Sequence, residues 1–192
     1  MSSFNRVVRD SSEPLNGDSV IHKCARLNNH SEIGNYAQEL SVNRRNNRME
    51  TPLIVAAQNS ACRTITKLAQ LGADVNAQDA EGNTALHYAV LNSSEKAVEA
   101  LANAFADANI QNSVGQTAMH LLSVGNYSSL AKLVSRNILR VRMDLLDRDG
   151  NSPFMAAVRY DSSRMVQYFL DLGYRPETRE ANLNTPLHVA VK

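Results

Sequence analysis

Tryptophan is absent from this 192-residue sequence, and only two residues, Cys24 and Cys62, are cysteine. Two cysteines cannot build the set of disulfides that stabilises many small secreted domains. The segment 1–16 also lacks the apolar core of a secretory signal peptide. These absences favour a reducing compartment, so we expect the protein in the cytoplasm, the nucleus or both.

A charge excess of either sign is also missing. The chain has 20 Lys and Arg against 19 Asp and Glu, a formal net charge of +1. This near neutrality gives no global reason to bind nucleic acid or an anionic membrane. No apolar run approaches the roughly 18 residues that a membrane-spanning helix needs. We therefore expect no membrane association and at most an indirect contact with nucleic acid.

The common motifs of catalysis and cofactor binding do not occur either. The sequence contains no Gly-x-Ser-x-Gly elbow, HExxH pair, Walker loop or GxGxxG fingerprint. We expect no enzymatic activity, no cofactor and no metal site.

What the chain does contain is a short motif that recurs at an almost constant interval. Each copy starts with Ser or Thr, continues with apolar residues or Pro, and in four cases has His at its fourth position. The six copies start at residues 19, 51, 84, 117, 152 and 185, at intervals of 32, 33, 33, 35 and 33 residues. Such regularity predicts a solenoid of stacked structural repeats.

The stretch Leu71–Ala89 predicts how one repeat joins the next. Gly72 follows a helix-like run and permits the positive φ with which many helices end. Residues 74–83 are polar and rich in turn formers. Thr84 precedes a new apolar-periodic run and is a good helix N-cap. We expect helices joined by protruding turns.

The interval near 33 residues and the TPLHVA segment at 185–190 resemble the ankyrin repeat. The resemblance covers residues 16–192 and implies an all-α solenoid of about five full repeats plus a partial sixth. In that family, paired antiparallel helices carry protruding β-hairpin or turn fingers. Repeats are expected to start near residues 17, 49, 82, 115, 150 and 183, after a flexible leader at 1–16. We expect a monomer.

Two repeats depart from the pattern. In the third, Phe105 takes the place of Gly72, so we expect a rearranged helix end rather than a phenylalanine with positive φ. In the fourth, Asn137 is the expected substitute for the glycine, and Leu122 replaces a small residue. Two extra residues in the segment 133–150 should lengthen the loop or finger of this repeat, which we expect to be the least regular.

The recurring histidines are His22, His87, His120 and His188. Equivalent positions in stacked helices lie about 10 Å apart, whereas metal ligands lie about 2 Å from a shared ion. We therefore expect each imidazole to hydrogen-bond the adjoining turn. Cys24 falls where other copies have small residues and is expected to be a buried hydrophobe.

The family resemblance also implies a binding surface. In ankyrin proteins the fingertips and inner helices form a concave face on which partner proteins bind. The candidate partner-binding residues are Arg44, Arg45, Arg48, Asp79, Glu81, Asn83, Tyr88, Leu91, Asn92, Asn112, Gln116, Leu121, Asp149, Arg159 and Tyr160. For Leu121, packing between neighbouring helices is an equally good alternative.

Arginines crowd the first finger and a second segment that contains Arg136, Arg140 and Arg142. Such runs are ordinarily solvated faces. The functional alternative is a basic edge for an acidic partner segment or for a nucleic-acid backbone held beside the partner.

Two sub-groups of the family share short segments with this chain. The GDSVIH segment at 17–22 resembles the opening repeat of IκB proteins, which implies a regulator that binds a Rel/NF-κB-type transcription factor. The basic first finger departs from that group, because a groove for a basic nuclear-import segment should be acidic there. The ADANIQN segment at 106–112 resembles the Notch-type ankyrin domain, which implies a scaffold for a transcription complex. A targeting segment of a larger enzyme is a further alternative.

One modification pattern occurs twice. Leu68–Asn76 and Leu101–Asn109 fit L-x5-[DE]-hydrophobic-Asn, which resembles the substrates of an asparaginyl hydroxylase. The resemblance implies hydroxylation of Asn76 and Asn109. The alternative is that Asp-x-Asn is an ordinary turn former.

Overall fold

The computed structural model describes residues 16–37, 40–138 and 140–174. Within these ranges the chain forms helices and turns, and no residue lies in a β-strand. The predicted all-α solenoid is confirmed, and its fingers are turns rather than β-hairpins. The predicted sixth repeat and residues 1–15 of the predicted leader lie outside the described residues. The helices of the described part are α1 (Val20–Arg26), α2 (His30–Tyr36), α3 (Pro52–Gln58), α4 (Cys62–Gln70), α5 (Ala85–Leu91), α6 (Glu95–Asn103), α7 (Ala118–Val124), α8 (Ser128–Asn137), α9 (Pro153–Arg159) and α10 (Ser163–Asp171).

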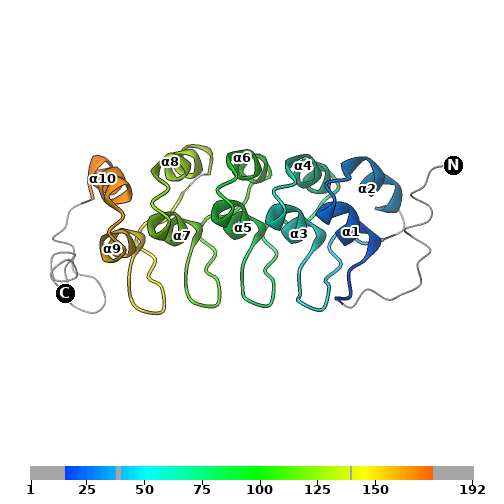
Figure 1. Cartoon of the computed structure of the whole chain (residues 1–192), viewed down its shortest axis with the longest axis horizontal. Coiled ribbons are helices and arrows are strands. Elements are labelled where there is room, and N and C mark those ends of the chain that lie inside the picture. Colours follow the sequence, from blue (N-terminus) through cyan, green and yellow to red (C-terminus); the bar gives the residue numbers. More distant parts are fainter. Residues whose placement is uncertain (1–15, 38–39, 139, 175–192) are drawn as a thin grey trace.

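The helices form two parallel rows (Figure 1). The inner row is α1, α3, α5, α7 and α9, and the outer row is α2, α4, α6, α8 and α10. Each inner helix contacts its own outer helix, and each inner helix from α1 to α7 contacts the inner helix of the next repeat. The fingers project from the side of the inner row, so inner helices and fingers together line one long face. No helix in the described ranges is long and apolar enough to cross a membrane.

Small side chains let the two rows approach closely. Four alanines of the inner helices are at most 3 % exposed, and their small side chains let the inner-helix backbone lie close to the outer row: Ala56, Ala57, Ala89 and Ala157. Cys24 occupies an equivalent place and is 4 % exposed, which confirms it as a buried hydrophobe. Leu122, the bulky member of this set, is fully buried.

Two positions after each described inner helix, a residue has left-handed backbone. These residues are small and polar: Asn28, Ser60, Ser93, Asn126 and Asp161, with φ between 51° and 58°. Asn and Asp tolerate this conformation better than larger side chains do. The repeats therefore share a backbone conformation at this position although they do not share a residue type there.

Most outer helices end in the same way, with one unexpected residue. Gly72 and Gly173 have φ of 82° and 83°, as predicted. Phe105 adopts the same conformation with φ of 62°, so the expected rearrangement is wrong. The amides of residues 105 and 106 donate to Ala102 and Leu101, as the amides of residues 72 and 73 donate to Ala69 and Leu68. The phenyl ring is 88 % exposed, so no packing opposes this backbone.

The fourth repeat differs at the end of α8. Asn137 still belongs to the helix and its side chain donates to the Leu133 carbonyl, so it does not replace the glycine. Arg140, with φ of 59°, takes that place instead. The two extra residues lie before Arg140, and seven positions separate Arg140 from Asp147 just as seven separate Phe105 from Asn112. Of the two predicted places for the extra length, the loop is right and the finger is wrong: α8 is one residue longer than α6, and Arg140 follows α8 by three positions where Phe105 follows α6 by two.

Candidate functional site

A buried histidine fixes the start of three inner helices. In the third repeat, Nδ1 of His87 lies 3.1 Å from the Thr84 amide and 2.8 Å from the Thr84 hydroxyl, and accepts from both. Its Nε2 then donates to the Gln116 carbonyl of the next repeat at 3.1 Å. His22 and His120 make the same contacts with the Glu50 and Asn151 carbonyls. The predicted bonding of histidine to the adjoining turn is confirmed for these three, and His188 lies outside the described residues.

Burial sets the protonation of these histidines. His22, His87 and His120 are at most 1 % exposed. Burial lowers the pKa of each imidazole, although the hydrogen bond to a backbone carbonyl opposes the effect. The neutral form suits the geometry, because Nδ1 must accept. In the described part of the chain, no three His, Cys, Asp or Glu side chains are grouped so that they could hold a metal ion.

Each finger is closed by a residue at its first position. Oδ1 of Asp79 accepts from the amides of Glu81 and Asn83 at 2.9 Å. Asn46, Asn112 and Asp147 accept from the amides two and four positions further on in the same way. Asn and Asp both supply the accepting Oδ1. The other terminal atom, Nδ2 of Asn or Oδ2 of Asp, can therefore differ between repeats.

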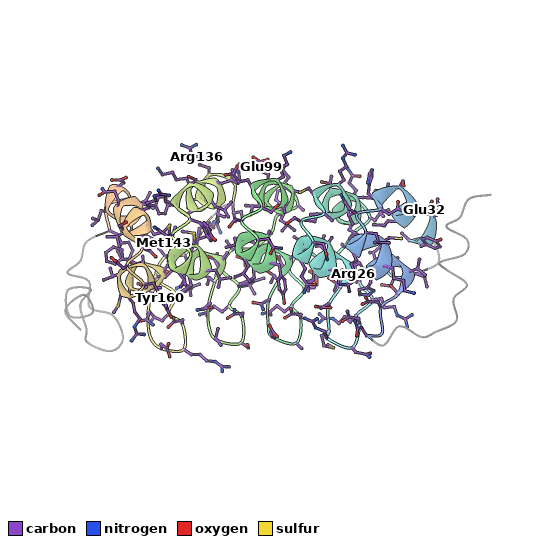
Figure 2. All side chains as sticks on the ribbon, in the orientation of Figure 1. Arg26, Glu32, Glu99, Arg136, Met143 and Tyr160 are labelled. Carbon is purple, nitrogen blue, oxygen red and sulfur yellow. The ribbon has the colours of Figure 1, made fainter. Side chains whose placement is uncertain are left out.

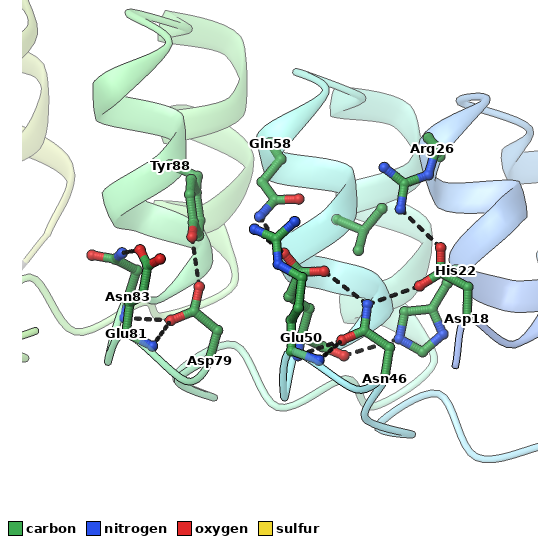
Figure 3. A network of polar contacts seen from close by, with 12 residues as sticks. Asp18, His22, Arg26, Asn46, Glu50, Gln58, Asp79, Glu81, Asn83 and Tyr88 are labelled. Atoms are coloured by element: carbon green, nitrogen blue, oxygen red, sulfur yellow. Dashed lines mark hydrogen bonds and ion pairs between the residues drawn. The ribbon is translucent and has the colours of Figure 1, made fainter. Parts of the chain in front are cut away.

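At the first finger, that second atom joins two carboxylates (Figure 3). Nδ2 of Asn46 donates to Asp18 at 2.8 Å and to Glu50 at 2.7 Å. Arg26 pairs with Asp18 at 2.8 Å, and Arg48 pairs with Glu50 at 3.2 Å. Burial alone would raise the pKa of Asp18, but the hydrogen bonds from Asn46 and Arg26 outweigh it and lower that pKa. The carboxylates of this cluster are buried while both arginines stay partly exposed, and Arg48 forms its ion pair within the fold.

At the second finger the same atom meets a tyrosine. The Tyr88 hydroxyl donates to Oδ2 of Asp79 at 2.6 Å (Figure 3). Burial and this bond to a carboxylate raise the pKa of Tyr88 to about 12. The structure thereby brings together two predicted site residues. Asn83 joins them through its backbone amide, which donates to Asp79, and its side chain contacts Glu81 and Asn112.

The middle of the inner-helix face is apolar. Leu91 at the end of α5 is 51 % exposed, and Val124 at the end of α7 is 37 % exposed. Tyr88 and Leu121, one turn earlier on the same helices, are partly buried against the core. We call Tyr88, Leu91, Leu121 and Val124 the central strip. For Leu121 the structure combines both alternatives, because this residue packs on the core and remains partly accessible.

Arginines stand at both ends of this face. Arg26 and Arg159 are the last residues of α1 and α9, the positions that Leu91 and Val124 hold in the middle repeats. Arg159 lies 3.9 Å from Asp149, another predicted site residue. Tyr160 follows and is 59 % exposed (Figure 2). The face thus runs from a charged end through an apolar middle to a second charged end with an aromatic side chain.

A family comparison agrees with this geometry. A model for ankyrin repeats (many copies) matches residues 36–89 and 139–192, and a model for ankyrin repeats (3 copies) matches residues 63–138. The chain belongs to the ankyrin-repeat family. Ankyrin repeats mediate binding to other proteins, so this chain is a protein–protein interaction module. A search among curated proteins gave no match.

Several predicted binding residues have a role within the ankyrin stack. The Arg45 guanidinium donates to the Met49 and Gln78 carbonyls, as the Gln78 amide donates to the Gly82 and Gln111 carbonyls one repeat later. Asn92 donates to the last carbonyls of α3. Arg44 is exposed, and its side chain forms no hydrogen bond or ion pair with the described residues. Partner binding by these residues stays a prediction.

The structure also shows exposed residues that sequence reasoning did not select. Leu27, directly after α1, is 63 % exposed and occupies the position of Asn92 and Tyr160. Aligning the repeats one residue beyond the inner helix would have found it. The exposed ring of Phe105 is a second such feature, because the repeat pattern concerns only the backbone at this position.

Asn76 and Asn109 lie where consecutive repeats meet. Oδ1 of Asn76 accepts from the Asp107 amide at 2.9 Å, and Oδ1 of Asn109 accepts from the Arg142 amide at 2.7 Å. Asn43 makes the same bond to the Asp74 amide one repeat earlier. These side chains hold the repeats in register.

Proposed function

We propose that this ankyrin chain binds one partner protein across its inner-helix face, with the central strip as the anchor. The observation that carries the proposal is the exposed apolar pair Leu91 and Val124 on adjacent helices, with Tyr88 and Leu121 beside it. Partly exposed apolar and aromatic side chains in the centre of a polar face are frequent binding anchors. Arg26 and Arg159 at the two ends favour a partner with acidic residues flanking an apolar segment.

In its finer form, the partner is a Rel-type transcription factor, and the chain is an IκB-like regulator that acts in the cytoplasm or nucleus as a monomer. The GDSVIH opening supports this choice. The Notch-type scaffold is the second candidate, supported by the ADANIQN segment and the long fourth repeat. The basic first finger weighs less against the first choice than its sequence suggests, because Arg45 and Arg48 are engaged within the stack.

A charge placed in the central strip should abolish partner binding without unfolding the chain. We expect the double variant Leu91→Glu and Val124→Glu to lose at least about hundredfold in affinity, since buried unpaired carboxylates cost several kcal/mol at an interface. Both side chains are exposed, so the thermal midpoint should change little. Leu172→Glu, at an exposed residue beyond the end of α10, is the matched control.

The measurement is surface-immobilised binding of a Rel-homology domain, with a Notch-pathway transcription complex as the second analyte. Binding of the first that only the strip variant loses would support the IκB-like choice. No retention of either at micromolar concentration would discard the finer assignments. Equal binding by both variants would show that the central strip is not the anchor.

We also propose Asn76 and Asn109 as hydroxylation sites. Their side-chain oxygens are bonded to the next repeat, while Asn76 stays exposed as a residue. Co-expression with an asparaginyl hydroxylase should add about 16 Da per site, measured by intact mass. Asn76→Ala with Asn109→Ala should show no addition, and an unmodified wild-type chain would refute the proposal.

A further inference from the structure

Phe105 and Arg140 share an unusual property. Both stand in left-handed backbone at the end of an outer helix, where the second and fifth repeats have glycine. A bulky side chain in this conformation costs free energy that glycine would avoid. Phe105 is also the most exposed large apolar side chain in the described ranges.

These two residues line one groove. The groove lies between the ends of α6 and α8, has a volume of about 500 Å³, and is bordered by Ala102, Phe105, Ala106, Asp107, Ile138 and Arg140. We call it the outer-edge groove. A second hollow of about 460 Å³ lies between α4 and α6, and Phe105 borders it as well. Phe105 therefore lies between two hollows whose linings combine apolar residues with polar ones, among them three asparagines in the outer-edge groove.

Hydrogen bonds hold the walls of the outer-edge groove in place. The Asn109 side chain donates to the Arg140 carbonyl at 2.9 Å and accepts from the Arg142 amide at 2.7 Å. The amides of Phe105 and Ala106 donate to the last carbonyls of α6. The groove is thus preformed, and binding would not need to order its backbone.

Arg140 offers the outer-edge groove a cation for a ligand carboxylate, and Asp107 is the carboxylate beside it. Arg140 forms no ion pair among the described residues, whereas Arg142 next to it is paired with Asp144 at 2.8 Å. Asp107, the carboxylate in the lining, accepts the Asn109 amide at 2.8 Å. Arg136 projects from the outer side of α8, and Glu99 lies on the outer side of α6 (Figure 2). A ligand carboxylate can pair with Arg140, and an apolar side chain next to it can pack on Phe105.

We propose that the outer-edge groove is a second docking site, for a peptide segment in which a bulky apolar residue adjoins an acidic one. The central strip lies on the inner helices, so this site lies apart from the proposed partner surface. Nucleic acid is a less favoured ligand. Proteins that bind nucleic acid neutralise several phosphates, whereas this groove offers one guanidinium without an ion pair, beside a carboxylate. Aromatic and arginine side chains are the residue types that most often dominate binding energy.

The test uses substitutions that should improve the fold while removing the site. Phe105→Gly and Arg140→Gly both relieve left-handed backbone, so each should raise the thermal midpoint of the full chain by about 1–4 °C. Each should also weaken the ligand at least about tenfold. Ser93→Gly relieves the same conformation beside an inner helix, so it should raise the midpoint and leave binding unchanged.

The probe is a capped twelve-residue peptide of alternating leucine and glutamate, titrated into the isotope-labelled full chain and followed by amide chemical shifts. We expect shifts at Phe105, Ala106 and Arg140, and weaker binding of matched leucine–lysine and serine–glutamate peptides. In the double variant of the central strip, the shifts at Phe105, Ala106 and Arg140 should report the same affinity as in the unmodified chain, which separates this test from that of the proposed function.

Three results would overturn the proposal. They are no binding of the leucine–glutamate peptide at millimolar concentration, equal affinity in both glycine variants, and tighter binding of a twelve-nucleotide oligothymidine. Self-association that Phe105→Gly abolishes, measured by analytical ultracentrifugation, would assign the groove to a second copy of the chain and would equally refute a peptide site.

Discussion

Acidification below pH 6.5 is expected to destabilise the chain steeply, because three buried histidines must remain neutral in the folded state. The folded-state pKa of His22, His87 and His120 lies below the ordinary value of 6.5. The stability they contribute is therefore complete above that value and is lost as the pH falls below it, down to the folded-state pKa. Each group contributes at most about 1.4 kcal/mol per pH unit, so three give at most about 4 kcal/mol per unit.

The measurement is urea unfolding at intervals between pH 7.5 and pH 5. Asp18 does not confound this window, because its lowered pKa places the corresponding loss below its ordinary value of 3.8. Each single substitution of these histidines by glutamine should lower stability at pH 7.5 and flatten the pH dependence. Ile65→Val, in the fully buried core of α4, should lower stability equally at every pH. An unaltered slope in the triple glutamine variant would contradict the explanation.

Asn46→Asp should cost about 3 kcal/mol at neutral pH, although the finger needs only an acceptor at this position. Asp79 and Asp147 show that an aspartate can close a finger. At the first finger, however, the new carboxylate would face Asp18 and Glu50, which now share the Asn46 amide. Loss of both donors and repulsion among buried carboxylates place the cost within the range of a broken buried charge network.

Asn112→Asp is the matched control for that substitution. The Asn112 amide donates to the neutral Asn83 side chain, so the same change removes one hydrogen bond without crowding charges. We expect a cost of about 1 kcal/mol there. Chemical denaturation of both variants at pH 7 and pH 5 measures the difference. Acidification should narrow the gap, since a repelled carboxylate protonates more readily, and equal costs at both sites would be inconsistent with the charge argument.

The repeat interval was enough to predict most of the fold. Ser or Thr caps, the buried histidines and the glycine ends at Gly72 and Gly173 are local requirements that recur with the motif. Phe105 and Arg140 could not be predicted in this way. Sequence reasoning took the glycine to be necessary, whereas the backbone keeps its shape and turns the larger side chain outward.

The binding face was predictable in outline and less so in detail. Spacing along the inner helices placed Tyr88, Leu91 and Leu121 on one face. It could not show that Arg45 and Asn92 contact neighbouring repeats, because these bonds join residues about one repeat apart. Nor could it show the ion pair of Arg48 with Glu50, which depends on side-chain geometry. The hydrogen bond of Asn112 to Asn83 likewise joins two fingers and becomes visible only when they are stacked.

The fingertips determine how the solenoid can bend. Backbone amides at Ala80, Ser113 and Arg148 donate to carbonyls of the preceding finger, and a Cβ added to Gly82 or Gly115 would lie 2.8 Å from the next finger's backbone. Neighbouring tips contact each other through their backbones, so no side chain between them can adjust. The helices of neighbouring repeats contact each other through side chains, which can repack. The spacing between neighbouring fingertips is therefore fixed, and the repeats can change their relative angle only by pivoting about the tips. A partner that changes the curvature of the solenoid would therefore displace the outer helices most. Binding at the inner face would then change the spacing of the outer helices.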